Sequence, residues 1–149
     1  MIKSCAFTGH RYELKDFDAE LLERVIKNLI ISGVVIFYCG MAVGFDLAAA
    51  ECVISLKKNY DVKLIACVPC EGQSDSYSGH DKIRYKRILD NSDEQILLSS
   101  HYFNGCMQAR DRFMVDNSNV LVYFLRKDEG GTFYTVNYAR KKELKIIGL

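Results

Sequence analysis

Short apolar runs alternate along this chain with segments in which apolar residues recur at helical spacing. The apolar runs typical of strands occupy the ranges 2–7, 34–39, 62–68, 95–98, 120–125 and 144–147, and the helical patterns occupy 17–30, 45–58, 82–90, 107–116 and 132–142. Several strand runs are apolar on both faces, which is typical of strands covered by helices on both sides. The alternation therefore predicts an α/β protein with a Rossmann-like three-layer fold, in which helices flank a mostly parallel sheet.

The size and the charge of the chain narrow the classes of protein further. Its 149 residues predict a single domain over 1–149, and 49% hydrophobic with 26% charged residues exclude intrinsic disorder. The formal net charge of +1 argues against a large phosphate footprint, so nucleic acid is not an expected partner. The sequence has no run of 18 apolar residues, and its polar N-terminal segment does not resemble a signal peptide. We therefore expect a cytoplasmic protein without a membrane partner.

The six cysteines raise the question of a redox or zinc site. Cys67 and Cys70 form a C-x-x-C pattern, but it ends a predicted strand, whereas a redox pair normally begins a helix. A zinc site would need a second pair of ligands at metal spacing, which the sequence does not offer. Cys5, Cys39, Cys52 and Cys67 lie in apolar runs, where a thiol behaves as a small hydrophobic group. We expect reduced thiols and no metal, and the sequence assigns no role to the C-x-x-C pair.

Glycine-containing turns follow four of the predicted strands. They occupy residues 8–11, 40–46, 69–73 and 126–132, and the second and fourth lead directly into predicted helices. In an open parallel sheet ligands bind beyond the carboxyl ends of the strands, and a free helix N-terminus attracts phosphate. Residues 40–44 and 130–132 are therefore candidate phosphate cradles, with Thr132 as a hydroxyl ligand or a helix cap. Neither the P-loop pattern nor GxGxxG is present, so the prediction depends on several turns acting together.

Charged side chains near these turns complete the candidate site. Arg110 shares a predicted helix face with Met107 and Met114, so its guanidinium needs a partner. That partner could be a phosphate, a carboxylate such as Asp46, or a carbonyl, and a structural salt bridge is the alternative to ligand binding. The candidate ligand-binding residues are Thr8, Gly9, His10, Arg11, Gly40, Met41, Gly44, Asp46, Glu71, Arg110, Gly130, Gly131 and Thr132. Aromatic residues in predicted loops that could stack on a nucleobase are Tyr12, Tyr77, Tyr102 and Phe103. No catalytic residue is assigned.

Five segments spread over nearly the whole chain form a recognisable series. They are Phe7-Thr-Gly-His-Arg11, Gly40-Met-Ala-Val-Gly44-Phe-Asp46 with Ala49-Ala-Glu51, Pro69-Cys-Glu-Gly-Gln73, Gly105-Cys-Met-Gln-Ala-Arg110-Asp-Arg112-Phe-Met-Val-Asp116, and Gly130-Gly-Thr132 with Tyr138-Ala139. The series resembles the SLOG superfamily, which joins the DNA-processing protein A (Smf) fold to the LOG cytokinin-activating enzymes, and most closely its YpsA-like branch. The resemblance implies a Rossmann-like sheet with nucleotide or nucleotide-derivative binding at its rim. It also implies a bacterial or phage cytoplasmic setting and frequent self-association, so we expect a homo-oligomer.

The enzymes of that superfamily supply a second hypothesis. LOG-type phosphoribohydrolases look as if they use an arginine from Met-His-x-Arg-Lys and a glutamate three residues after the threonine of Pro-Gly-Gly-x-Gly-Thr. Here Arg110 follows Met107 at the matching spacing, whereas Thr135 stands where the glutamate is expected. Glu71 or Asp46 would have to supply the missing carboxylate.

Three functions follow from the sequence, and a nucleotide-binding or nucleotide-sensing domain is preferred. Its expected ligand is a nucleotide-type small molecule whose phosphate binds at the strand rim, and no cofactor is assigned with certainty. The alternative is a nucleoside-monophosphate N-glycosidic hydrolase of the LOG type. The further alternative is DNA binding through basic runs at 57–58 or 140–142, which the near-neutral charge disfavours.

Overall fold

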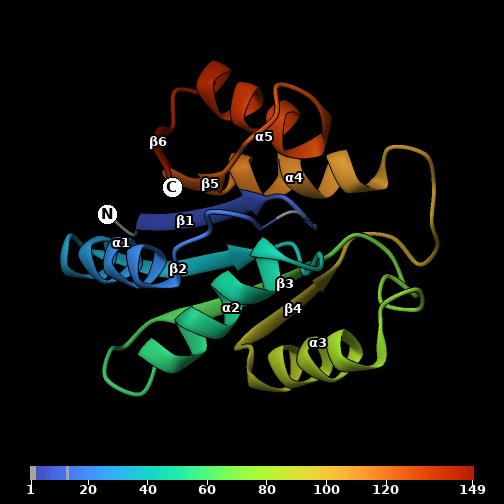
Figure 1. Cartoon of the computed structure of the whole chain (residues 1–149), viewed down its shortest axis with the longest axis horizontal. Coiled ribbons are helices and arrows are strands. Elements are labelled where there is room, and N and C mark those ends of the chain that lie inside the picture. Colours follow the sequence, from blue (N-terminus) through green and yellow to red (C-terminus); the bar gives the residue numbers. More distant parts are fainter. Residues whose placement is uncertain (1–2, 13) are drawn as a thin grey trace.

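Strands and helices alternate strictly along the chain. The computed structural model describes residues 3–12 and 14–149, and this part of the chain forms six strands and five helices (Figure 1). Their bounds are β1 Lys3–Gly9, α1 Ala19–Ile31, β2 Val34–Cys39, α2 Phe45–Leu56, β3 Lys63–Val68, α3 Gly79–Asn91, β4 Glu94–Leu97, α4 Cys106–Asp116, β5 Val120–Phe124, α5 Gly130–Lys141 and β6 Lys145–Gly148. Every predicted element is present, with its ends shifted by three residues or fewer. Ile2, which the sequence includes in the first strand, lies outside the described residues.

The strands form one sheet in the order β4-β3-β2-β1-β5-β6. Every neighbouring pair is parallel, which is the arrangement expected of strands joined by helical crossovers. Helices α1, α2 and α3 cover one face of the sheet, and α4 and α5 cover the other (Figure 1). The three-layer Rossmann-like fold predicted from the alternation is therefore confirmed.

Local signals explain where α1 begins and ends. The Asp18 carboxylate accepts hydrogen bonds from the backbone N–H groups of Glu20 and Leu21, at 3.0 and 3.2 Å, so the helix begins directly after this cap. Gly33 follows the last turn with φ of 109°, a conformation that favours glycine. The helix therefore ends where the sequence predicts.

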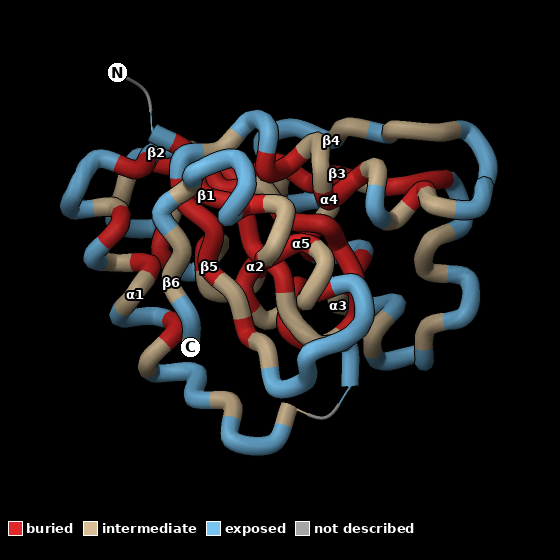
Figure 2. Tube along the Cα trace, turned by 90° about the horizontal axis from the view of Figure 1, so that it is seen from above, coloured by how far each residue is buried: buried red, intermediate tan, exposed pale blue. Residues whose placement is uncertain are grey.

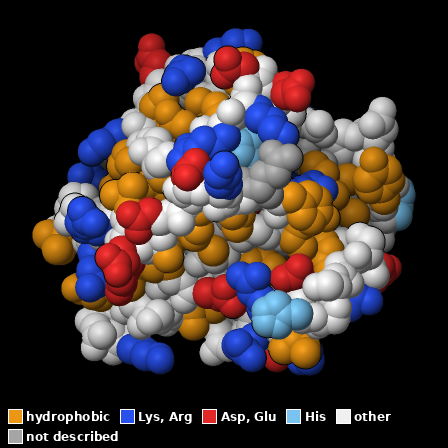
Figure 3. All heavy atoms as spheres, viewed as in Figure 1, with side chains coloured by type: hydrophobic (Ala, Val, Ile, Leu, Met, Phe, Trp, Pro, Cys, Tyr) orange, Lys and Arg blue, Asp and Glu red, His pale blue; other side chains and the backbone are white. Residues whose placement is uncertain are grey.

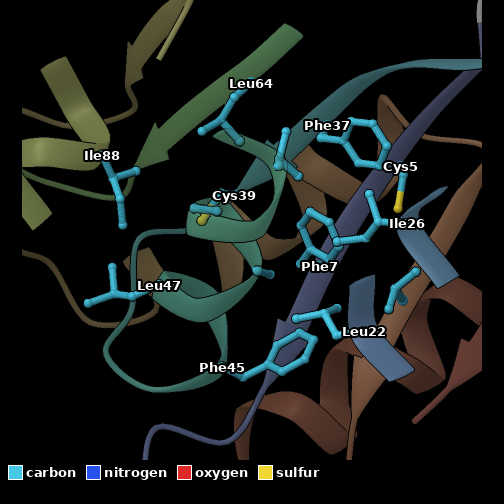
Figure 4. Packing of buried hydrophobic residues seen from close by; sticks show 14 of the residues in the cluster. Cys5, Phe7, Leu22, Ile26, Phe37, Cys39, Phe45, Leu47, Leu64 and Ile88 are labelled. Atoms are coloured by element: carbon cyan, nitrogen blue, oxygen red, sulfur yellow. The ribbon is translucent and has the colours of Figure 1, made fainter. Parts of the chain in front are cut away.

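Two hydrophobic clusters hold the three layers together. The larger one lies between the sheet and α1–α3, where the rings of Phe7 and Phe37 stack with their centroids 5.8 Å apart (Figure 4). The smaller one lies under α4 and α5 and includes Met114, Leu121 and Val136. Figure 2 shows that the buried residues concentrate along the central strands and the inner sides of the helices. Burial of each large apolar side chain contributes about 1.5–3 kcal/mol to the stability of the fold. The clusters therefore hold the strands and helices in place, and with them the polar turns at the carboxyl ends of the strands.

The direction in which strands are added reverses next to β1. From β1 the chain adds β2, β3 and β4 on one side, and it then returns to place β5 and β6 on the other side. β1 and β5 are paired, with Gly9 opposite Phe124. In open α/β sheets ligands bind outside the carboxyl ends of the strands at such a reversal. The topology therefore directs attention to the turns that follow β1 and β5.

Candidate functional site

A cavity of about 490 Å³ lies at this reversal of strand order. Most of its lining comes from three segments, 8–11 after β1, 104–108 at the start of α4 and 129–132 at the start of α5. The other lining residues are Ala42 before α2, Asp46 of α2, Tyr102 before α4, and Arg110 and Asp111 in the interior of α4. Small-molecule sites span roughly 300–1,000 Å³, so the cavity has the size of a binding site.

Nine of the residues predicted from the sequence line the cavity together. They are Thr8, Gly9, His10, Arg11, Asp46, Arg110, Gly130, Gly131 and Thr132. The other four, Gly40, Met41, Gly44 and Glu71, lie outside the lining. Turns that are far apart in the sequence thus meet at one place, as expected for the carboxyl ends of parallel strands.

Buried polar side chains gather around the cavity. Among the described residues they are Ser4, Thr8, Asp46, Arg110, Asp111, Thr132 and Thr135. All of them except Ser4 and Thr135 belong to the lining, and Thr135 donates a hydrogen bond to the lining residue Asp111 at 3.0 Å. Burial of charged groups costs several kcal/mol that their pairing only partly offsets. Their concentration at one place is therefore typical of a functional site rather than of a stabilising core.

Arg110 lines the cavity with 5% of its surface exposed. Its Nε donates to Oδ1 of Asp111 at 2.9 Å, and its Nη1 donates to the carbonyl oxygen of Gly40 at 2.7 Å. A Cβ at Gly40 would stand 2.9 Å from Nε of Arg110, so glycine at this position admits the guanidinium. A carboxylate and a carbonyl therefore both hold the Arg110 guanidinium. They are two of the three kinds of partner expected from the sequence, and the third is a phosphate.

Asp46 is a second buried charge in the lining, with 4% of its surface exposed. Its Oδ2 accepts a hydrogen bond from the backbone N–H of Ala42 at 3.3 Å. Desolvation by burial raises the pKa of Asp46 to about 7, although the nearby Arg110 guanidinium opposes the shift. Near neutral pH this carboxyl group can therefore donate as well as accept a hydrogen bond.

Three helices begin at the cavity without a capping side chain. The N-cap residues of α2, α4 and α5 make no side-chain cap hydrogen bond, whereas Asp18 caps α1 and Ser78 caps α3. The start of α2 differs from the other two, because its first turn already contains the carboxyl group of Asp46. The first turns of α4 and α5 contribute lining residues, so their positive dipole ends adjoin the cavity. Such uncapped helix starts attract an anion.

Gly131 occupies a position where the fold itself does not need glycine. No described atom lies within 4 Å of a Cβ built there, and its φ is not in the left-handed region. The neighbouring Gly130 differs, because its φ of 89° favours glycine. Gly131 lines the cavity and carries no side chain, so its backbone is open to close approach by a ligand.

Gly44 shapes the cavity without lining it. Its φ is 84°, and a Cβ there would lie 2.2 Å from the carbonyl oxygen of Arg11. The next residue, Phe45, donates its N–H to the carbonyl oxygen of His10 at 3.1 Å. Nε2 of His10 accepts a hydrogen bond from the N–H of Arg126 at 2.7 Å. These contacts join the turns after β1, β2 and β5.

Met41 and Glu71 have other surroundings. Met41 is fully buried, and its carbonyl oxygen accepts a hydrogen bond from the Tyr77 hydroxyl at 2.9 Å. Glu71 is exposed in the turn after β3, where its N–H donates to the carbonyl oxygen of Ser99 at 3.3 Å. Of the two carboxylates proposed in place of the LOG glutamate, only Asp46 lines the cavity.

Asp111 is the main residue of the lining that sequence reasoning missed. Asp111 follows Arg110 directly, and adjacent residues of a helix point about 100° apart. A helix with only one buried face would therefore not be expected to bury both side chains. Helix α4 instead packs against both the sheet and α5, so both residues are buried. Asp111 therefore adds a buried carboxylate from α4 beside Asp46, and it accepts hydrogen bonds from Arg110 and from Thr135 of α5. Glu129 and the loop residues Tyr102 and Asn104 also line the cavity.

The two cysteines of the C-x-x-C pattern are buried free thiols. Desolvation by burial raises the pKa of Cys67 to about 12, so its thiol is protonated at neutral pH. Burial and the hydrogen-bonded thiol of Cys106 raise the pKa of Cys70. In the part of the chain that the structure describes, no group of three or more His, Cys, Asp or Glu side chains could hold a metal.

Charges of both signs are mixed over the surface. On the face shown in Figure 3, Lys and Arg side chains lie among Asp and Glu instead of forming one basic patch. In the two basic runs considered for DNA binding, Lys57 forms an ion pair with Asp93, and Lys142 lies 3.9 Å from Asp116. Arg11 is exposed at the cavity and forms no ion pair with a described residue. None of the described helices combines the length and the apolar character needed to cross a membrane.

One family model and several curated relatives match most of the chain. The model of the YspA SLOG family (YpsA) matches residues 5–146. The uncharacterised SPbeta prophage-derived protein YoqJ of Bacillus subtilis is 32% identical over 121 residues, which cover 72% of this chain and 71% of that protein. A UPF0398 protein of Listeria monocytogenes is 28% identical over 156 residues, which cover 95% of this chain and 86% of that protein.

Two solved structures have the same fold. DNA processing protein A from Helicobacter pylori, described for its single-stranded DNA binding mode, matches 98% of this chain with a TM-score of 0.70 and 19% identity. DNA processing protein A from Streptococcus pneumoniae matches 99% of this chain with a TM-score of 0.71 and 21% identity. The matches span 64% and 50% of those two longer chains, respectively.

These structures correct one expectation drawn from composition. The net charge of +1 led to the prediction that nucleic acid is not a partner, and that prediction is wrong, because a protein of the same fold is described as binding single-stranded DNA. Net charge sums the whole surface, whereas a nucleic acid contacts only a local part of it. A sum near zero therefore does not exclude nucleic-acid binding.

Proposed function

The chain belongs to the YspA SLOG family, and on that premise we propose that its cavity binds the phosphate of a nucleotide or a nucleotide derivative. The observation that carries the proposal is the meeting of two uncapped helix starts, those of α4 and α5, with a buried arginine in one cavity. Helix starts supply N–H groups and positive dipole ends, and Arg110 supplies a full positive charge. Arg11 adds a second cation at the exposed side of the same cavity.

The carboxylates of the lining restrict how much negative charge the ligand can carry. Two arginines, Arg11 and Arg110, stand against Asp46, Asp111 and Glu129. A single phosphate can lie at the helix starts, whereas a polyphosphate would bring further negative charge close to these carboxylates. We therefore expect AMP to bind more tightly than ATP. In this proposal Asp46 hydrogen-bonds a sugar hydroxyl or a base of the ligand.

Gly131→Ala tests the proposal, with Gly79→Ala as the matched control. Both glycines lie in the first turn of a helix, and at both a Cβ would meet no described atom within 4 Å, but only Gly131 lines the cavity. We expect Gly131→Ala to weaken AMP binding by about tenfold or more, because a methyl group in the ligand's path costs about 1–3 kcal/mol. The control should bind AMP like the wild type, and isothermal titration calorimetry measures both.

The wild-type protein is first screened with AMP, ATP, ADP-ribose and NAD in a thermal-shift assay. A ligand at 100 times its Kd stabilises the folded state by about 2.7 kcal/mol, which gives a clear shift. A folded protein that responds to none of these probes would refute nucleotide binding. Equal affinity of Gly131→Ala and wild type would show that the phosphate does not lie at the start of α5.

Single-stranded DNA is the second candidate ligand, and the fold shared with DNA processing protein A of Helicobacter pylori favours it. Tyr102 lines the cavity with 66% of its surface exposed, so a base could stack on its ring. Arg11 lies in the same lining and could contact a backbone phosphate.

Fluorescence anisotropy with a labelled oligothymidylate at several salt concentrations tests this second candidate. If Arg11 contacts one phosphate, Arg11→Ala should lower the slope of log affinity against log salt by about 0.7. The exposed Arg24, outside the cavity and outside both basic runs, provides the control variant Arg24→Ala, which should leave the slope unchanged. Absence of binding at low salt, or an unchanged slope in Arg11→Ala, would speak against DNA in this cavity.

A further inference from the structure

A chain of hydrogen bonds runs from α5 through α4 to the cavity. The Thr135 hydroxyl donates to Oδ2 of Asp111 at 3.0 Å, and Oδ1 of Asp111 accepts from Nε of Arg110 at 2.9 Å. All three side chains are buried, with 0%, 6% and 5% of their surfaces exposed. The cavity lining includes Asp111 and Arg110 but not Thr135. Thr135 therefore does not contact a ligand in the cavity itself and acts on it through lining residues.

Two anchors fix the plane of the Arg110 guanidinium. Nε is held by Asp111 and Nη1 by the carbonyl oxygen of Gly40, and a guanidinium is planar, so these two bonds determine where the third nitrogen points. Nη2 makes no hydrogen bond to any residue that the structure describes. Because Arg110 lines the cavity, Nη2 has both of its N–H groups available to bind an anion.

The Thr135 hydroxyl has one proton and two acceptors within reach. They are Oδ2 of Asp111 at 3.0 Å and the carbonyl oxygen of Gly131 at 2.8 Å. Hydrogen bonds to a charged acceptor are about twice as strong as those between neutral groups, so the carboxylate is the preferred acceptor. The same hydroxyl thus touches both the residue that holds Arg110 and the backbone of the first turn of α5.

We propose that Thr135 is a positioning residue, whose hydroxyl orients Asp111 and thereby holds the Arg110 guanidinium with Nη2 toward the bound anion. The inference rests on the proposed function, since it assigns the anion to the same cavity. It also explains what a threonine does at the position where the LOG enzymes carry a glutamate. Here the hydroxyl supports a carboxylate on the neighbouring helix.

Thr135→Val removes the hydroxyl and keeps the shape of the side chain, and Thr135→Ser keeps the hydroxyl. We expect Thr135→Val to weaken AMP binding by roughly tenfold, the equivalent of one hydrogen bond to a charged group. Thr135→Ser should bind within about threefold of the wild type, which corresponds to less than about 1 kcal/mol. Tyr138→Phe is the control, because it removes a hydroxyl-to-carboxylate hydrogen bond of 2.7 Å from the same helix, outside the cavity.

A second measurement follows Arg110 itself and needs no ligand. In ¹⁵N NMR spectra the Nε–H signal of Arg110 should be protected from solvent exchange in the wild type, Thr135→Ser and Tyr138→Phe, and less protected in Thr135→Val. Loss of protection in Thr135→Val alone supports positioning even if the wild type binds no AMP, an outcome that would refute the proposed function only. Protection and AMP affinity that are both unchanged in Thr135→Val would refute the positioning role.

Discussion

The buried carboxyl group of Asp46 makes the stability of the protein depend on pH. With 4% of its surface exposed, it has lost nearly all contact with water, and this loss raises its pKa to about 7. In an unfolded chain an aspartate titrates near 3.8. The folded protein therefore binds more protons than the unfolded chain between about pH 4 and pH 7, so the free energy of unfolding falls as pH rises through this range.

Asp46→Asn should remove this part of the pH dependence. The stabilising contribution of protonated Asp46 is complete below about pH 4 and is lost above about pH 8, and over that range it amounts to a few kcal/mol, on the order of 1.4 kcal/mol per pKa unit. We expect the free energy of unfolding of the wild type minus that of Asp46→Asn to fall between about pH 4 and pH 8 and to stay constant above about pH 8. Urea unfolding at a series of pH values measures this difference, and a difference independent of pH would contradict the environment assigned to Asp46.

At the scale of elements, the five helices divide into two groups by how they begin. Asp18 and Ser78 cap α1 and α3 with their side chains, and neither residue lines the cavity. The helices α2, α4 and α5 begin at the cavity without such caps. A side-chain cap would satisfy the N–H groups that an anion would bind, so capped starts suit helices that only stabilise the fold, and the uncapped starts of α4 and α5 suit the binding of an anion.

Asp18→Ala tests this division. Loss of the cap leaves the N–H groups of Glu20 and Leu21 without their acceptor, so we expect the free energy of unfolding to fall by about 1 kcal/mol. AMP affinity should not change, because α1 does not line the cavity. Thermal or urea unfolding measures the first effect and calorimetry the second. A loss of affinity comparable to that in Gly131→Ala would show that the helix starts are not functionally separate.

At the scale of the whole molecule, strand order decides where a ligand can bind. β5 lies beside β1, on the side opposite β2. The turns that follow β1 and β5 therefore lead to helices on opposite faces of the sheet, and the cavity lies between these two turns. The segments 8–11 and 129–132 meet there although more than a hundred residues separate them. A chain with the same strands added in one direction only would have no such reversal.

Much of this arrangement could be predicted from the sequence. The apolar run at 34–39 matches the bounds of β2, and the glycine at 33 ends α1 as expected. Nine of the thirteen candidate residues line the cavity, because they were chosen as turn residues at the carboxyl ends of strands. Gly40 and Gly44 were predicted by the same rule, yet one admits Arg110 and the other accommodates the backbone of Arg11. A glycine in a turn has several physical causes, and only its neighbours in space distinguish them.

The order, the type and the approximate ends of the elements can be derived from the amino-acid sequence, because apolar periodicity, caps and turn residues act over a few neighbouring positions. Which polar groups meet depends instead on how the layers pack. Arg110 donates a hydrogen bond to the carbonyl oxygen of Gly40, which lies 70 positions away in the sequence, and Asp111 accepts one from Thr135, which lies 24 positions away. These pairs form because α4 is enclosed between the sheet and α5, which buries two adjacent residues that point in different directions. No single segment carries that information, since it depends on the packing of layers that are distant in the sequence.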